Sequence, residues 1–190
     1  LNLYSVLRVV KKPILGIGLG MQLMADYSTE GNFSCLGFFS GTAIKFDDSV
    51  QESSYKGMHK IKYCRHSALF EGIEENAEFF FNNSYYLPKS DLSTSTCSNT
   101  ITFCASIENE NAFGVQFHPE VHHTPNGIEL LKHFAVDICG VTPDWTPASI
   151  IEASVKRIRE QVGRERVLAA VSGGVDSTVA AALVHKAIGD

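Results

Sequence analysis

The sequence has no long hydrophobic run, and none of its apolar stretches approaches the roughly 18 residues that span a bilayer. It also lacks a secretory signal and any run of five or more like charges. These absences argue against a membrane protein. They argue equally against nucleic acid as the main partner, because phosphate binding needs a basic face and the formal net charge is −5.

The cysteines show neither a CxxC pair nor zinc-ligand spacing. Their number is odd, which suits reduced thiols better than a disulfide framework, so we expect a cytoplasmic protein. The five are Cys35, Cys64, Cys97, Cys104 and Cys139.

The chain does not begin with Met, and an apolar helical pattern continues to its last residues. Its 190 residues suffice for one domain and part of another. We therefore expect an internal fragment of a longer protein.

Short apolar runs that alternate with turns and helical patterns predict an α/β fold. Pro13–Ile17 is expected to be a buried strand that leads through a glycine turn into a helix at Met21–Ala25. Ala112–Phe117 is expected to be a second strand, running into His118. We also predict strands at Ala77–Phe81 and Ile101–Ile107, an exposed loop at Ser90–Thr100 and a helix at Ile128–Val136.

Two prolines and a glycine make residues 139–147 a linker between domains at 1–138 and 148–190. Beyond it, Ala148–Val162 has the periodicity of an amphipathic helix. Val167–Val171 is a continuous apolar run, as in a buried parallel strand. A glycine-rich turn and an Ala-rich helix, Thr178–Ile188, follow.

The turn Gly16–Gly20 lies between a strand and a helix. In hydrolases such a turn lifts one side chain above the sheet and aims the next backbone N–H at the oxyanion hole. The central residue here is Gly18, which has no side chain to lift.

This segment resembles class I glutamine amidotransferases, whose pattern is Gly-x-Cys-x-Gly-x-Gln. Phe113–Glu120 resembles the family's His and Glu segment. The resemblance implies a flavodoxin-like domain, truncated at its N-terminus, in which cysteine attacks the glutamine amide. His118 would be the base and Glu120 would orient it, but Gly18 replaces the nucleophile, so we expect no glutaminase activity.

The same resemblance implies the residues that contact glutamine. The Leu19 N–H would help to hold the oxyanion, and the other donor would precede residue 1. The remaining implied contacts are Gly20, Gln22, Ser84 and Tyr85.

Simpler interpretations of these motifs remain. The glycines also fit a plain strand-to-helix turn, while a dinucleotide turn would want glycine where Met21 stands. A metal cluster is a further possibility, although Pro119 disfavours a helical ligand pair. Its ligands would be His118, Glu120, His122 and His123.

The middle of the chain resembles the glutaminase subunit of imidazole glycerol phosphate synthase, at Cys35–Gly41, Leu69–Ile73 and Phe80–Tyr86. That family usually has Val-His where this chain has Asn82-Asn83, and Gly where it has His59.

A second site is predicted at Ser172–Ser177, where a glycine-rich loop follows an apolar run and opens a helix. Backbone N–H groups and the helix dipole then face one point. No Gly-Lys-Ser/Thr follows, so it is not a Walker loop. It resembles the loop of ATP pyrophosphatases, of the adenine-nucleotide α-hydrolase-like fold. The resemblance implies ATP, with Mg²⁺ near Asp176, bound by Ser172, Gly173, Gly174, Val175, Asp176, Ser177 and Thr178.

From Val121 onward the chain resembles glutamine-hydrolysing GMP synthase. The resemblance implies a ligase that uses glutamine-derived ammonia to aminate XMP, and a homodimer formed through the part beyond residue 190. Both resemblances include Phe113–Glu120, so the chain is either a divergent GMP synthase or two genes joined there, and we slightly favour the join. Two more possibilities are the imidazole glycerol phosphate synthase glutaminase and a non-catalytic glutamine-sensing module.

Overall fold

The structure is a computed structural model that describes residues 3–47, 55–98 and 100–189. Backbone contacts divide the chain into two compact units, Leu1–Val141 and Thr142–Asp190. Within the described residues, no helix combines the length and apolarity needed to cross a membrane. The domain boundaries at 138 and 148 remain predictions.

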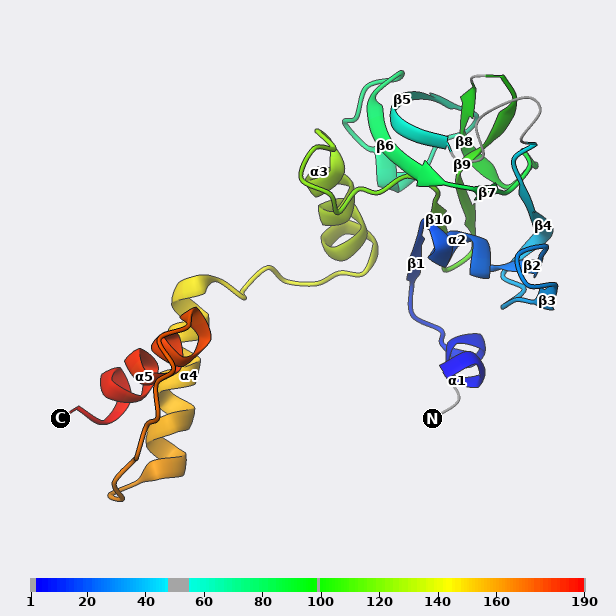
Figure 1. Cartoon of the computed structure of the whole chain (residues 1–190). Helices are drawn as coiled ribbons and strands as arrows, with labels where there is room; N and C mark the ends of the chain where they lie inside the picture. The colour runs from blue at the N-terminus through cyan, green and yellow to red at the C-terminus, as the bar shows by residue number, and fades with distance from the viewer. Residues whose placement is uncertain (1–2, 48–54, 99, 190) are drawn as a thin grey trace. The chain divides into compact units, whose positions relative to one another are not determined.

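The first unit is built on a six-stranded sheet ordered β1-β10-β9-β8-β5-β6. β1 pairs in parallel with β10, and the other neighbours are antiparallel. The strands are β1 (Ile14–Ile17), β5 (Tyr55–Tyr63), β6 (Glu78–Asn83), β8 (Ser93–Ser98), β9 (Thr102–Asn109) and β10 (Ala112–Val115). Figure 1 shows β1 and β10 side by side, with α2 (Leu19–Leu23) next to them.

A smaller sheet in the same unit has the order β3-β2-β4-β7. Its strands are β2 (Ala25–Ser28), β3 (Phe33–Ser34), β4 (Phe39–Lys45) and β7 (Tyr85–Tyr86). The remaining elements are α1 (Leu3–Val9), the 3₁₀ turn η1 (Ala68–Phe70), α3 (Gly127–Lys132) and its π-helical continuation η2 (His133–Ile138).

The predicted strand at Pro13–Ile17 is confirmed as β1. The helix after it begins at Leu19 and ends at Leu23, so the prediction of Met21–Ala25 is wrong at both ends. Ala25 instead starts β2, where it pairs with Phe39 of β4. The expected helix at Ile128–Val136 is present, but it widens into a π-helix after Lys132.

Aromatic rings fill the main core of the first unit. Phe79 stacks on Phe117 with ring centroids 4.1 Å apart, and Phe81 meets Phe103 edge to face at 5.9 Å. All four rings are fully buried. Such pairs are favourable beyond the area they bury, so β6, β9 and the segment that ends at His118 are firmly fixed relative to one another.

The exposed loop predicted at Ser90–Thr100 is wrong over most of its length, because Ser93–Ser98 form the interior strand β8. Buried hydroxyls can replace aliphatic side chains in a core when they bond to one another. Thr94 Oγ1 and Ser95 Oγ each lie 2.6 Å from Ser106 Oγ on β9. Polar composition therefore indicated a loop where mutual hydrogen bonding permits a buried strand.

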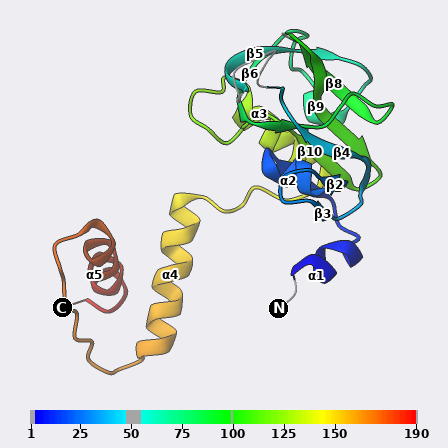
Figure 2. The same cartoon turned by 45° about the vertical axis from the view of Figure 1, so that its right-hand side comes forward.

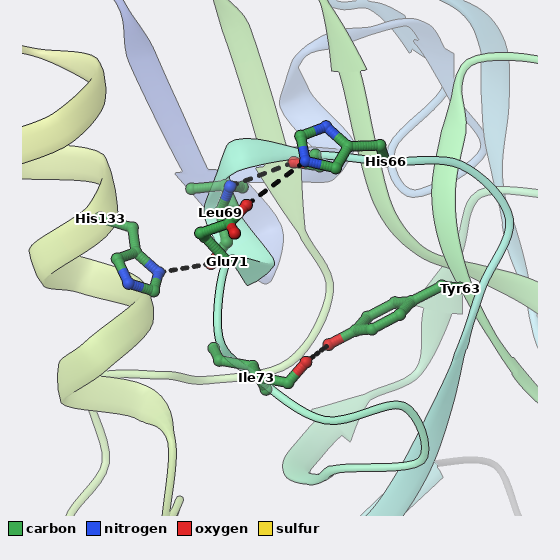
Figure 3. Close-up of polar contacts among 7 residues, drawn as sticks. Tyr63, His66, Leu69, Glu71, Ile73 and His133 are labelled. Carbon is green, nitrogen blue, oxygen red and sulfur yellow. Dashed lines mark hydrogen bonds and ion pairs between the residues drawn. The ribbon is translucent and has the colours of Figure 1, made fainter.

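The segment after β5 is held by three side chains that reach backbone or each other (Figure 3). The Tyr63 hydroxyl donates to the Ile73 carbonyl at 2.9 Å, and His133 Nδ1 of η2 lies 3.1 Å from the Leu69 carbonyl oxygen. His66 and Glu71 form an exposed pair at 3.4 Å. These contacts fix η1 against η2.

The second unit contains the helices α4 (Pro147–Val162) and α5 (Val175–Ile188), which lie side by side (Figures 1 and 2). Thr146 caps the start of α4 through a reciprocal capping box with Ser149. Arg159 Nε donates to the Ala187 carbonyl at 2.7 Å, which satisfies the C-terminal end of α5.

The strand predicted at Val167–Val171 is wrong for this structure, where the segment is irregular and Leu168 is 99% exposed. A strand needs a neighbouring strand for its backbone hydrogen bonds, and the described residues of the second unit contain none. The helix expected from Thr178 begins three residues earlier, at Val175.

We predict that Ser106→Ala lowers the unfolding free energy by about 1–3 kcal/mol, because it leaves two buried hydroxyls without their partner. Ser98→Ala is the matched control, since Ser98 Oγ pairs with Thr102 Oγ1 across the same strands but is exposed. Its cost should stay within about 0.5 kcal/mol. Urea denaturation followed by tyrosine near-ultraviolet circular dichroism measures both, and equal costs would contradict the prediction.

Candidate functional site

The turn after β1 has the backbone of a strained elbow. Gly18 has φ 54° and ψ −113°, a region that side-chain-bearing residues rarely adopt. A β-carbon on Gly16 would lie 2.7 Å from the Gly20 backbone, so the two ends of the turn come too close for any larger residue at position 16. The sequence therefore keeps the sharp strand-to-helix turn although its central residue has no side chain.

His118 lies over the empty face of this elbow. The Gly18 N–H donates to the Val115 carbonyl at 2.8 Å, which extends the parallel pairing of β1 and β10 to the turn itself. A β-carbon built on Gly18 would be 3.0 Å from His118 Cε1 and 3.2 Å from Nε2. The imidazole therefore contacts the position that a nucleophile at residue 18 would occupy.

Glu120 completes a pair with this histidine. Its Oε1 lies 2.8 Å from His118 Nδ1, on the side of the ring away from Nε2. Backbone bonds fix the ring's attachment, since the His118 N–H donates to the Phe80 carbonyl and the Thr124 hydroxyl donates to the His118 carbonyl, both at 2.8 Å. A carboxylate on Nδ1 favours a ring whose Nε2 can exchange a proton with a group at residue 18.

A hollow of about 270 Å³ adjoins the elbow. It is lined by Leu19, Gln22, Glu30, Asn82, Asn83, Ser84, Tyr85, Gln116 and His118. The expected contact residues Leu19, Gln22, Ser84 and Tyr85 are thus brought together with His118, whereas Gly18, Gly20 and Glu120 adjoin the hollow without lining it. Leu19 and Gly20 open α2, where backbone N–H groups have no acceptor within the helix.

Sequence reasoning missed three lining residues as site residues. Asn83 stands out in the sequence only as a departure from a motif, and Gln116 lies within the His-Glu segment but two positions before the histidine. Glu30 had no signal, because it comes from the β2–β3 turn and only folding brings it here. Asn83 and Gln116 could have been found from the parity of their strands, which places them on the same face as Phe81 and His118.

The thiols offer no substitute nucleophile at this hollow. None of the five cysteines lines it. Burial raises the pKa of Cys104 to about 12, and burial likewise raises the pKa of Cys97 and of Cys35. Nucleophilic thiols require the thiolate form, so these three side chains are suited to packing.

The glycine-rich loop of the second unit is compact. Gly173 has φ 84°, and a β-carbon there would meet no atom within 4 Å, so the backbone is open to an approaching group. Ser172 Oγ lies 3.1 Å from Ser177 Oγ, and Thr178 Oγ1 donates to the Gly174 carbonyl. Val175, Asp176 and Ser177 belong to the first turn of α5 and not to the loop. An open glycine backbone before a helix N-terminus fits a phosphate group.

The alternative of a metal cluster gains no geometric support. Across residues 3–47, 55–98 and 100–189, no group of three or more His, Cys, Asp or Glu side chains is placed to hold a metal ion. His123 instead packs edge-on against Phe80 with ring centroids 4.3 Å apart.

The model of the family "glutamine amidotransferase class-I" matches residues 2–138. The chain therefore belongs to the class I glutamine amidotransferases. The fold agrees: the crystal structure of a Thermoplasma acidophilum protein, provisionally described as one of the subunits of GMP synthase, has a TM-score of 0.56 at 21% identity, covering 73% of this chain and 62% of that one.

Curated relatives are glutamine-hydrolysing GMP synthases. Those of Acetivibrio thermocellus and Carboxydothermus hydrogenoformans are 43% and 42% identical over 180 and 181 residues, which is 93% and 94% of this chain. The enzyme of Aspergillus fumigatus is 40% identical over 94% of the chain. The chain spans about a third of these relatives, between 31% and 32% of their length.

We predict that two cysteines react with Ellman's reagent in the native protein and five after unfolding in guanidinium. Cys64 is exposed and Cys139 partly exposed, whereas the other three are buried. Absorbance at neutral pH counts the released thiolate, and Cys64→Ser should remove the faster phase. Three or more reactive thiols in the folded protein would contradict the assignment.

Proposed function

We propose that this chain is the glutamine amidotransferase region of a GMP synthase, followed by the start of its synthetase part, and that it binds glutamine without hydrolysing it. The observation that carries the proposal is the His118 imidazole, paired with Glu120 and seated over a strained elbow at Gly18. A proton shuttle is in place, but the atom it would serve is missing.

The roles follow from the geometry. Glutamine occupies the hollow with its amide group toward Gly18. The N–H groups of Leu19 and Gly20 at the start of α2 face the amide oxygen. Gln22, Ser84 and Tyr85 bind the amino acid end. Without a thiol no thioester forms, and only the small residual catalysis of binding and oxyanion stabilisation is left.

The choice of GMP synthase rests on the alignments. Each of the three relatives aligns over more than nine-tenths of the chain, across both the middle and the C-terminal segments. One ancestral protein therefore accounts for the whole sequence, and a junction between two genes is not required. This favours the divergent GMP synthase over the imidazole glycerol phosphate synthase glutaminase, which remains the alternative for the middle segment alone.

The remainder of the proposal concerns the second unit. We assign residues 172–178 to the phosphate loop of an ATP pyrophosphatase domain, with the Ser172 and Ser177 hydroxyls and the Gly173 backbone toward pyrophosphate. Asp176, in the first turn of α5, is suited to hold Mg²⁺ on the pyrophosphate. ATP bound there would activate XMP as its adenylate, and free ammonia would replace the glutamine-derived ammonia.

We predict that Gly18→Cys raises glutamate release from glutamine by at least about 100-fold, because loss of a catalytic nucleophile costs up to about 10⁶ in rate. The thiol would give its proton to His118 and add to the amide carbon. Ammonia would then leave with that proton, and water would hydrolyse the thioester to glutamate. A coupled glutamate dehydrogenase assay measures the release.

Gly18→Ala is the matched control, since it imposes the same backbone strain and the same 3.0 Å approach to His118 without a thiol. Both variants should lose about 1–3 kcal/mol of stability. Only Gly18→Cys should gain activity, and His118→Asn in that background should abolish the gain. A folded Gly18→Cys protein with no gain would refute the role of this elbow.

We also predict that the chain retains ATP·Mg²⁺ on a filter-binding assay and that Ser177→Ala weakens retention several-fold. Ser154→Ala, on α4, is the control for a serine outside the loop. Retention separates the two family alternatives, because the glutaminase subunit of imidazole glycerol phosphate synthase has no ATP pyrophosphatase part. Equal retention by both variants would count against the loop assignment.

A further inference from the structure

Three amide side chains from separate elements meet beside the hollow, two of them at one backbone carbonyl. The Tyr85 oxygen accepts from Gln22 Nε2 at 3.0 Å and from Asn83 Nδ2 at 2.9 Å. Gln22 Nε2 also donates to Gln116 Oε1 at 3.3 Å. We refer to Gln22, Asn83 and Gln116 as the amide cluster.

The amide cluster joins the three walls of the hollow. Gln22 belongs to α2, which starts at the elbow, and Gln116 stands two residues before His118. Asn83 ends β6 and holds the Ser84–Tyr85 wall. The Ser84 carbonyl is itself engaged by the Phe46 N–H at 3.0 Å, so the Tyr85 carbonyl is the remaining handle by which this wall is oriented.

Holding this wall with Asn83 is costly. Asn83 is 7% exposed, and its Oδ1 is buried with no hydrogen-bond partner among the described residues; Gln116 Nε2, in a fully buried side chain, is in the same condition. Each such group costs about 1–3 kcal/mol. Local rules are broken in this way chiefly where function requires it, which sets Asn83 apart from an ordinary packing residue.

We propose that Asn83 is a positioning residue: through the Tyr85 carbonyl it sets the Ser84–Tyr85 wall at the distance from Gln22 that an α-amino acid in the hollow requires. The inference rests on the proposed function of the hollow. What position 83 must supply is a hydrogen-bond donor of the right reach, so an imidazole there serves as well as an amide.

The test measures glutamine affinity by calorimetry for the native chain, Asn83→Ala, Asn83→His and Asn109→Ala. Loss of the Asn83 bond should weaken binding about tenfold, the equivalent of one hydrogen bond. Asn83→His, which keeps a donor, should stay within about threefold of the native affinity.

Asn109→Ala is the control for lost structure, because the Asn109 amide also donates to a backbone carbonyl, that of Phe38 at 3.1 Å, but does not line the hollow. It should lower stability without changing affinity. If Asn83→Ala binds glutamine as the native chain does, or if Asn83→His is as weak as Asn83→Ala, the positioning role is wrong.

Hydrogen exchange separates this failure from failure of the proposed function. Residues 84–86 should exchange faster in Asn83→Ala than in the native chain, Asn83→His or Asn109→Ala. If the native chain binds no glutamine, the proposed function falls, and exchange alone then decides the positioning role. Unchanged exchange at residues 84–86 in Asn83→Ala would overturn it.

Discussion

The parallel pairing of β1 with β10 is the constraint on which the site depends. Parallel strands end at the same edge of a sheet, and here the pairing runs from Ile14 opposite Ala112 to Ile17 opposite Val115. Gly18 and His118 follow these two strand ends directly, about a hundred residues apart in sequence. One backbone bond from Gly18 to Val115 therefore brings the elbow under the histidine.

The rest of the first unit keeps that junction in place. Stacked rings hold β6 against the segment before His118, and the Phe80 carbonyl takes the His118 N–H. Gln22 and Gln116 connect the helix after one strand end to the chain after the other. A site so tightly held needs little rearrangement when a ligand binds, which is the requirement for stabilising charge by fixed dipoles.

The absence of a nucleophile changes what this geometry can do. The strained backbone at Gly18 costs a glycine nothing, whereas a side chain there would carry both strain and a close contact with the imidazole. His118 accordingly lies nearer to the turn than a residue with a β-carbon would readily allow. The structure retains binding and proton transfer groups around an amide-sized space, and it lacks the bond-forming atom.

The sequence by itself determined the strand–turn–helix at Gly16–Gln22, the His118–Glu120 pair and the amidotransferase fold, because each depends on local residue types at fixed spacing. Only the tertiary structure decided that Ser93–Ser98 are buried, since hydroxyl partners on β9 supply what composition cannot show. The tertiary structure also withheld a strand from Val167–Val171 and brought Glu30, Asn83 and Gln116 to the hollow. Both outcomes depend on which segments become neighbours, and hydrogen bonds between distant segments carry no signal in the order of residues along the chain.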